Sequence, residues 1–342
     1  YRKDSCVRNH RAIADYHERT IVGSFDPRIA DVEPTKAKYG LNLQVQYFYG
    51  GLRDDDGRLY VLERKFIGPM TSGLWLMTNR DAEHLRLAPG SLRTSRGEIR
   101  RHFNAESHRY ADALMAKVGR DLVSGEEQPL DLSFTDGGIT WSEGDLLACE
   151  ATPVGTGLMH YSPMPADSLL YTMQAYRAEG TVMGRHATGF VLVDHGYWPH
   201  GPEWKEFRFF AHSQVAWNVF ANEYEDGTVD AGFFICGLND FAVAGTFDTK
   251  GPRFATSELE ASLTMADDDW MGSARYAAGG EEWVFTPEPA GRMNEFSSAR
   301  WAGYRAQAGV TRRTGDTRPL KVGWTWLEFF ADRARAGGFV TG

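Results

Sequence analysis

Short runs of apolar, aromatic and β-branched residues, separated by glycines and Asp-Gly pairs, recur along most of this 342-residue chain. Runs of this length with such boundaries are typical of β-strands joined by tight turns. Asp56-Gly57 and Asp226-Gly227 each lie between two such runs, which is a sequence signature of a β-hairpin. The pattern predicts strands at 42–49, 59–67, 130–134, 139–142, 146–151, 169–178, 180–183, 187–193, 206–212, 217–224, 231–237, 257–266, 283–286 and 321–330.

Helical periodicity is rare in the sequence. Tyr110, Leu114 and Val118 fall on one helical stripe, and Asn104 is a suitable residue to cap its start. Many short strands with only isolated helices favour barrels or sandwiches over a βαβ fold. The expected helices cover 8–19, 105–118 and 328–336.

The long-range pattern indicates two β-units. The segments 49–67 and 220–237 both comprise a strand, an acidic Asp-Gly turn and an apolar strand, which hints at duplication. The Pro-containing stretch 162–165 is a suitable connector between two barrels of similar size. We therefore expect an N-terminal extension at 1–40, a first barrel at 41–162 and a second barrel with a C-terminal helix at 166–342.

The composition narrows the set of partners. A formal charge of −9, from 37 basic and 46 acidic residues, argues against nucleic acid and against docking on an anionic membrane. No apolar run is long enough for a spanning helix, so no integral membrane segment is expected. Three widely spaced cysteines fit a reducing compartment, and we expect a cytoplasmic protein, a trimmed export signal being the alternative. The sequence leaves open whether the protein forms a homodimer.

One predicted strand leads into residues with proton-transfer chemistry. The apolar run at 189–193 is followed by Asp194-His195, and then by Tyr197 and Trp198. An Asp can orient and charge-stabilise an imidazole that titrates near neutral pH, so the pair is a candidate for acid-base catalysis. The aromatic rings add an apolar wall and a π-face for a developing cation. The alternative is a surface Asp-His pair with the aromatics in the core.

Several segments resemble the carotenoid 1,2-hydratase (hydroxyneurosporene synthase) family. The segment QVQYFYGGLRDDDGRLY at 44–60 is similar to that family's opening strand and Asp-Gly-Arg hairpin. The segment 170–198 is similar to its second signature, which ends in Asp-His-Glu-Trp, and VGWTWLE at 322–328 to its closing strand. The resemblance implies a mostly β protein of two lipocalin-like antiparallel β-barrels, with few helices and an apolar cavity. It also implies hydration, cyclisation or isomerisation of isoprenoid or polyketide substrates without a metal or organic cofactor.

Several positions depart from the family pattern. Tyr197 and Trp198 match its aromatic position only after a shift, and Gln44, Val45 and Gln46 occupy the positions of a Glu and two Trp. Asp194 and His195 match its Asp-His, but Gly196 and Gln44 stand where the family has glutamates. Asp194 and His195 are therefore predicted to carry the proton transfer largely alone. An apolar enclosure would raise the pKa of Asp194 and let it donate a proton near neutral pH.

Other residues are expected to shape the pocket. Arg208 and His212 lie four apart in a predicted strand and so face the same side, toward either a cavity or solvent. His160 and Tyr161 precede the connector, where the two barrels could meet. Ordinary core packing is the alternative for every aromatic residue. The predicted substrate-binding residues are Tyr47, Tyr49, Tyr171, Tyr197, Trp198, Trp204, Arg208 and His212, with Trp75, Tyr176 and Trp217 as further strand aromatics.

The sequence carries no recognisable metal or cofactor motif. It has no His-Glu-x-x-His, paired cysteines or clustered carboxylate loop. Gly155-Thr156-Gly157 lacks the third glycine of a dinucleotide site. We thus expect a cofactor-independent lyase or isomerase for a hydrophobic isoprenoid or polycyclic small molecule. The alternatives are a lipocalin-like carrier without chemistry and a template that holds one substrate conformer for cyclisation.

Overall fold

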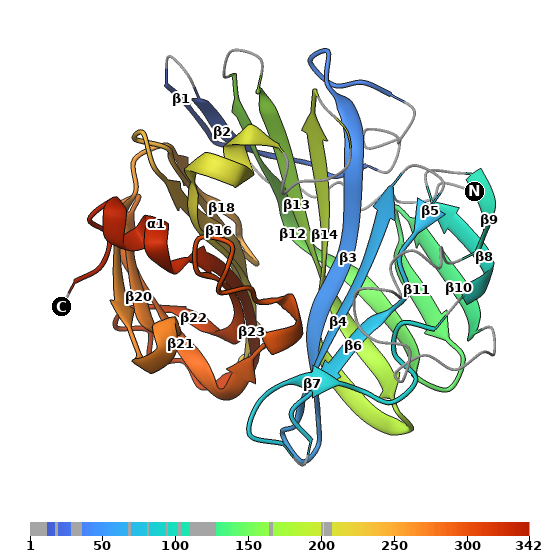
Figure 1. The fold of residues 1–342 in the computed structure, drawn as a ribbon. Coiled ribbons are helices and arrows are strands. Elements are labelled where there is room, and N and C mark those ends of the chain that lie inside the picture. Colours follow the sequence, from blue (N-terminus) through green and yellow to red (C-terminus); the bar gives the residue numbers. More distant parts are fainter. Residues whose placement is uncertain are drawn as a thin grey trace.

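The computed structural model describes residues 12–17, 20–28, 36–67, 70–80, 82–93, 95–101, 104–109, 128–163, 167–199, 201 and 207–341. Within these ranges the chain is mostly β and forms two curled, predominantly antiparallel sheets that pack side by side (Figure 1). The predicted fold class is confirmed. No helix in the described part of the chain is long and apolar enough to cross a membrane.

The first sheet is the larger of the two and contains 14 described strands. Its neighbours pair antiparallel except for β8 and β10, which pair in parallel. Its path runs β7 (Arg86–Leu87), β6 (Trp75–Thr78), β4 (Leu59–Ile67), β3 (Asn42–Asp54), β14 (Arg185–Trp198), β13 (Leu169–Val182), β12 (Leu147–Ser162), β11 (Gly138–Glu143), β10 (Gln128–Thr135), β8 (Ser95–Arg101) and β9 (Asn104–Arg109). Off this path, β1 (Ala14–His17) pairs with β2 (Thr20–Phe25), β2 with β12, and β5 (Met70–Thr71) with β4.

The second sheet contains nine described strands, all from the C-terminal part of the chain. Its order is β18 (Gly251–Thr256), β17 (Ala242–Asp248), β16 (Val229–Gly237), β15 (Gln214–Tyr224), β23 (Leu320–Phe330), β22 (Tyr304–Arg313), β21 (Glu281–Arg292), β20 (Met271–Ala278) and β19 (Glu260–Met265). The described helical segments are the π-helical turn η4 (Phe209–Ser213), the short 3₁₀ turns η5 (Asp267–Asp269) and η6 (Asn294–Phe296), and α1 (Ala331–Ala336).

The boundary between the two units differs from the expected one. β13 and β14 belong to the first sheet, so the change of sheet falls between Trp198 and Gln214 rather than at 162–166. The reason is local pairing. Ser162 lies opposite Leu169, so β12 and β13 pair as neighbours in the first sheet and the chain does not change sheet between them.

Strand pairing also replaces most of the expected helices. The described part of 8–19 contains β1, which pairs with β2. Within 105–118, residues 105–109 pair with β8 as part of β9, and residues 110–118 lie outside the described ranges. The C-terminal helix is confirmed but starts at Ala331, because β23 continues to Phe330. Conversely, the strand expected at 206–212 is replaced in part by the π-helical turn η4.

The three central strands β3, β13 and β14 have two buried faces. Figure 1 shows them between the second sheet and the outer strands of the first. On β14, Val191 and Val193 belong to the core inside the first barrel, whereas Phe190 and Leu192 belong to the core between the sheets. Because side chains alternate along a strand, the same short segment supplies both cores.

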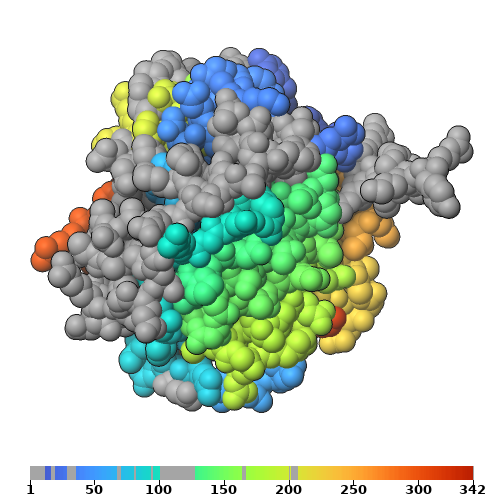
Figure 2. Space-filling model, turned by 90° about the vertical axis from the view of Figure 1, so that its right-hand side faces the viewer, coloured from blue at the N-terminus to red at the C-terminus, as the bar shows by residue number. Residues whose placement is uncertain are grey.

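The outer surface of the first barrel lies on the opposite side of the molecule from the second sheet. Figure 2 shows this side, with residues of the strands from β10 to β14 in green and yellow-green at its centre. The second sheet shows only at the edges of that view. Any cavity between the sheets is therefore shielded from this side by the whole first barrel.

Close backbone contact joins the two sheets. A Cβ atom on Gly51 of β3 would lie 2.1 Å from Cδ1 of Trp324 on β23, whose ring is fully buried. Only glycine allows the indole to lie directly against the β3 backbone. Arg53, two residues along, donates hydrogen bonds to both carboxylate oxygens of Glu288, at 2.8 and 3.3 Å. These contacts fix the distance between the sheets beside the cavity described below.

A buried ion pair organises the interior of the first barrel. Nε and Nη2 of Arg64 each lie 2.6 Å from an oxygen of Glu143, and both side chains are fully buried. Arg64 also donates to Thr71 and Ser95, while Trp141 donates to Glu143 from 2.8 Å. The pair and its hydrogen bonds thus connect β4, β5, β8 and β11. Most polar atoms of the two buried side chains have a partner.

We predict that Arg64→Met lowers the free energy of unfolding by about 3–5 kcal/mol, because it leaves the Glu143 carboxylate buried and unpaired. Urea unfolding monitored by tryptophan fluorescence measures this loss. The matched control is Arg100→Met, which removes an exposed pair with Asp131 at 2.6 Å and should cost about 1 kcal/mol or less. Equal losses in the two variants would contradict the prediction.

Candidate functional site

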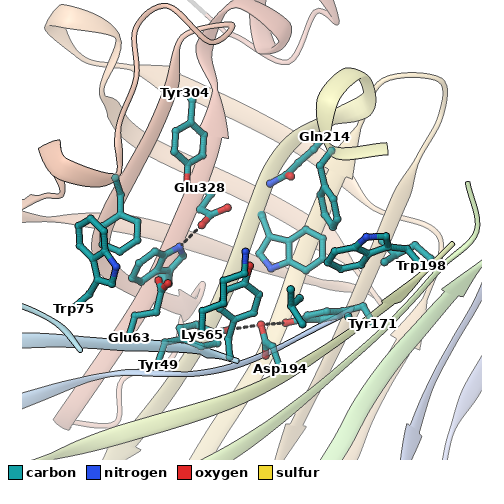
Figure 3. Close-up of a pocket in the computed structure, with 18 of the residues that line it drawn as sticks. Tyr49, Glu63, Lys65, Trp75, Tyr171, Asp194, Trp198, Gln214, Tyr304 and Glu328 are labelled. Atoms are coloured by element: carbon teal, nitrogen blue, oxygen red, sulfur yellow. Dashed lines mark hydrogen bonds between the residues drawn. The ribbon is translucent and has the colours of Figure 1, made fainter. Parts of the chain in front are cut away.

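A cavity of about 300 Å³ lies between the two sheets. β3, β4, β13 and β14 form its floor, and residues of β15, β22, β23 and the turns η4 and η6 form its roof (Figure 3). Aromatic side chains supply most of the lining, with a few charged and amide groups among them. The lining residues are Val45, Tyr47, Tyr49, Glu63, Lys65, Trp75, Leu169, Tyr171, Asp194, Gly196, Trp198, Phe210, Gln214, Trp217, Glu295, Phe296, Tyr304, Trp326 and Glu328.

Asp194 lies in the floor of this cavity. It shares the strand face of Phe190 and Leu192, so alternation along β14 turns its carboxyl toward the second sheet. Tyr49 and Tyr171, on the two strands that flank β14, donate hydrogen bonds to Oδ2 over 2.6 and 2.7 Å. Oδ1 is buried and accepts no hydrogen bond from the described residues. One oxygen of the carboxyl is therefore fixed by two hydrogen bonds, while the other has no partner among the described residues.

Burial changes the acidity of this group. It raises the pKa of Asp194 to about 7, although the hydrogen bonds from Tyr49 and Tyr171 lower it in part and the charge of Glu328 raises it slightly. Burial, followed by the charge of Asp194, raises the pKa of both tyrosines well above 10, so they stay protonated and act as donors. Asp194 can thus either donate or accept a proton near neutral pH.

Aromatic rings surround the carboxyl. The Trp217 ring meets Tyr171 edge-on, with centroids 4.6 Å apart. Trp326 meets Tyr49 in the same manner at 5.8 Å. Rings held in this way keep water away from Asp194 and offer electron-rich faces to positive charge.

A second polar cluster lies in the roof and along one side. Glu328 accepts a hydrogen bond from Nε1 of Trp326 over 2.9 Å. Burial, and then Glu328 by its charge and a hydrogen bond, raises the pKa of Tyr304 well above 10. Glu63 and Lys65 project into the same cavity from β4 (Figure 3). The carboxylates outnumber the single lysine, so the lining favours neutral or cationic groups over anionic ones.

The structure brings together some of the predicted site residues and separates others. Alternation turns His195 to the opposite face of β14 from Asp194, where its Nε2 lies 2.8 Å from Nε2 of Gln46 and its Nδ1 lies 3.1 Å from Oγ1 of Thr172. Tyr197 packs on that face as well. The two neighbours in sequence thus do not form a catalytic pair in space. The predicted residues that do line the cavity are Asp194, Tyr47, Tyr49, Tyr171 and Trp198, together with Trp75 and Trp217.

The remaining predicted residues lie elsewhere. Arg208 has 75% of its side chain exposed and lies 3.8 Å from Asp167, and His212 is exposed on η4. Their shared strand face does not exist, because the backbone there is helical. Trp204 lies outside the described residues. His160 does lie where the sheets meet, against Tyr171 and three other aromatic rings, and burial lowers its pKa to about 3.

The sequence did not predict the polar residues that line the cavity from β4, from its roof and from the start of β15. Their signal was present but weak. Glu63, Arg64 and Lys65 are three successive charges inside an otherwise apolar strand, and Glu328 ends a Trp-rich strand. What places them in one cavity is pairing between distant strands, which a single sequence does not specify. Within the described ranges, no three His, Cys, Asp or Glu side chains gather as a metal site requires.

Comparison with known proteins supports the fold. No family model matches the sequence, and no curated protein matches it. The crystal structure of a protein from Nitrosomonas europaea, provisionally named AttH, is similar with a TM-score of 0.50 at 17% identity, covering 85% of this chain and 93% of that one. Kievitone hydratase from Nectria haematococca has a TM-score of 0.45 at 9% identity, covering 90% and 93%.

At this identity the first likeness shows a shared two-barrel fold and nothing of the reaction. The two-barrel architecture expected from the family resemblance is therefore confirmed. Membership of the carotenoid 1,2-hydratase family itself stays a prediction.

We predict that Asp194→Asn makes the protein more stable than wild type at pH 8, by about 1–3 kcal/mol. The pKa of Asp194 is raised in the fold to about 7, from 3.8 in an unfolded chain. The protonated Asp194 carboxyl therefore contributes fully to the free energy of unfolding below pH 4, and this contribution is lost as pH rises through 7. Asn has no such loss, so the two proteins should differ much less at pH 5 than at pH 8.

Urea unfolding at both pH values measures this difference. His160 is common to both proteins, so its own titration cancels. Glu258→Gln, at an exposed carboxylate, is the control and should show no such pH-dependent gain. A difference between wild type and Asp194→Asn that is the same at pH 5 and pH 8 would refute the shifted acidity.

Proposed function

We propose that the protein is a lyase or isomerase that acts on an apolar small molecule by acid-base catalysis, with Asp194 as the acid. One observation carries the proposal. A buried carboxyl with a pKa of about 7 lines an aromatic cavity, and two tyrosines hold one of its oxygens by hydrogen bonds. Burial that raises a carboxyl pKa toward the working pH is the usual way in which proteins prepare a general acid.

The proposed step transfers the proton on Oδ1 of Asp194 to one carbon of a substrate double bond, and the π-electrons form the new C–H bond. The neighbouring carbon becomes cationic, next to the faces of Trp217 and Trp326. A water molecule then adds to it and returns one proton to the Asp194 carboxylate. Alternatively, loss of a proton from an adjacent carbon to Asp194 gives the isomerised alkene. Dehydration is the first route in reverse, with protonation of a hydroxyl that leaves as water.

The two tyrosines have a defined part in this scheme. Their hydrogen bonds stabilise the carboxylate that remains after the proton has left, because both donate to Oδ2. They also leave Oδ1 as the atom that carries the mobile proton. His195 has no role in the transfer, since it lies on the other face of β14.

The lining of the cavity supports the proposal that the substrate is an isoprenoid or polycyclic molecule without an acidic group. Aromatic walls suit an extended apolar frame, and the excess of carboxylates disfavours an anion. The same walls would suit a carrier that binds such a molecule without changing it. A carrier, however, has no use for a carboxyl kept at a pKa near 7 at a cost in stability, which favours the enzyme.

We predict that wild-type protein converts at least one member of a panel of neutral isoprenoid and polycyclic alkenes and alcohols, and that Asp194→Asn lowers kcat by 100-fold or more, in the range of general acid-base effects of about 10²–10⁴. Mass spectrometry of extracts detects gain or loss of water, and in D₂O it detects deuterium in isomerised product. Wild-type protein that retains a panel compound unchanged would indicate a carrier. Full activity of the Asn variant would refute the role of Asp194.

We also predict that Tyr49→Phe shifts the pH dependence of kcat/KM. The hydrogen bond from Tyr49 lowers the pKa of Asp194, so its loss raises that pKa. A reaction that needs protonated Asp194 should then persist to higher pH, by about one unit if the hydrogen bond contributes ~1.4 kcal/mol. Tyr197→Phe is the matched control, a buried tyrosine on the opposite face of the sheet. A shift of similar size in Tyr197→Phe would refute this assignment.

A further inference from the structure

Gln214 is a buried side chain whose amide has no hydrogen-bond partner among the described residues. Only 1% of the residue is exposed, yet neither Oε1 nor Nε2 has a partner among the described residues. The side chain lines the cavity between the sheets, and Figure 3 shows its amide projecting from the roof, across the cavity from Asp194. Buried amides are nearly always hydrogen-bonded in native proteins, so an exception in a cavity wall calls for a partner.

A β-bulge places this amide in the cavity. On β15 the pairing with β16 steps from Gln214 opposite Gly237 to Ala216 opposite Cys236, so Val215 is an extra residue. In a regular strand, residues 214 and 216 would share a face, and Ala216 belongs to the core inside the second barrel. The bulge turns Gln214 to the face of Trp217 and the cavity instead. Bulges commonly redirect a side chain beside a functional site.

Hydrogen bonds from a buried arginine hold the backbone at Gln214. The guanidinium of Arg333, on α1, donates hydrogen bonds to the carbonyl oxygens of Phe210 at 2.7 Å and Gln214 at 2.9 Å, and also to that of Ala211. Arg333 is itself buried. A buried arginine thus fixes the backbone at the start of β15. A binding group that is preorganised requires a backbone held in this way.

A second polar atom without a partner among the described residues belongs to a residue across the cavity. Oδ1 of Asp194 is buried and unpaired among the described residues. A ligand that satisfied both atoms would need two polar groups on one apolar frame. An amide can both donate and accept a hydrogen bond, so a hydroxyl or enol of a ligand can bind either its oxygen or its nitrogen. The acidic lining disfavours a carboxylate.

We propose that Gln214 is a specificity residue that binds a non-reacting hydroxyl or enol of the substrate, while Asp194 acts at a second position of the same molecule. This inference rests on the proposed function for the role of Asp194, but the binding part stands on the cavity alone. It narrows the substrate class to a neutral apolar frame with an oxygen function remote from the reacting bond.

Isothermal titration calorimetry tests the inference with 2-naphthol and 2-methylnaphthalene, which have the same frame with and without a hydroxyl. Wild type should bind 2-naphthol at least tenfold more tightly than 2-methylnaphthalene, and 2-naphthoate more weakly than either. Gln214→Leu should abolish the preference for 2-naphthol while keeping the affinity for 2-methylnaphthalene. Gln214→Asn, which keeps the amide but shortens its reach, should lose most of the preference and serves if the Leu variant does not fold.

Gln174→Leu is the matched control. Gln174 is also a buried glutamine, but it accepts a hydrogen bond from Tyr176 inside the first barrel, away from the cavity. This variant should keep the tenfold preference. Equal affinity of wild type for 2-naphthol and 2-methylnaphthalene, including no binding of either, would overturn the inference, as would a preference that survives in Gln214→Leu. Because no turnover is measured, these outcomes are independent of whether Asp194→Asn is inactive.

Discussion

Two-sided burial of β3, β13 and β14 is the constraint on which the rest of this structure depends. One face of these strands fills the first barrel and the other packs against the second sheet, so in their central segments neither face meets bulk water. A residue on either face must therefore be apolar or have its polar atoms satisfied. The few polar side chains on the face toward the second sheet consequently stand out, and Asp194 with its two tyrosines is the clearest of them.

This constraint also explains the acidity of the site. In a half-exposed sheet, water would solvate the Asp194 carboxylate and keep its pKa low. Here the first barrel shields the carboxyl on one side, and Trp217 and Trp326 of the second sheet pack against its two tyrosines on the other. The fold does not need a second carboxylate or a metal to raise the pKa, because burial is the largest cause. The tyrosines limit that shift while they orient the group.

Much of the fold could be predicted from the sequence because the alternation of apolar and polar residues is local. Strand positions, the Asp-Gly hairpins and the two-barrel fold class follow from it. The sheet to which β13 and β14 belong does not, since it depends on pairing with β3, far away in the chain. Within the helix expected at 8–19, residues 14–17 form β1 for the same reason, because pairing with β2 outweighs local propensity there.

The site was predictable only in part. Asp194 could be found because an acid directly follows an apolar run, and Tyr49 and Tyr171 because they are strand aromatics. The expected partnership with His195 ignored the period of two, by which adjacent strand residues face opposite ways. Gln214 could not be found, since its orientation results from a bulge that only the register with β16 reveals.

The distance along the chain between Tyr49 and Asp194 has a consequence for how the protein is made. These residues are 145 positions apart, whereas the strands of the second sheet all follow residue 213. During synthesis, the floor of the cavity can therefore be complete before its roof has been translated. Until then water reaches the Asp194 carboxyl, which stays ionised. Docking of the second barrel then requires uptake of on the order of half a proton at pH 7, so mildly acid conditions should favour the docked state.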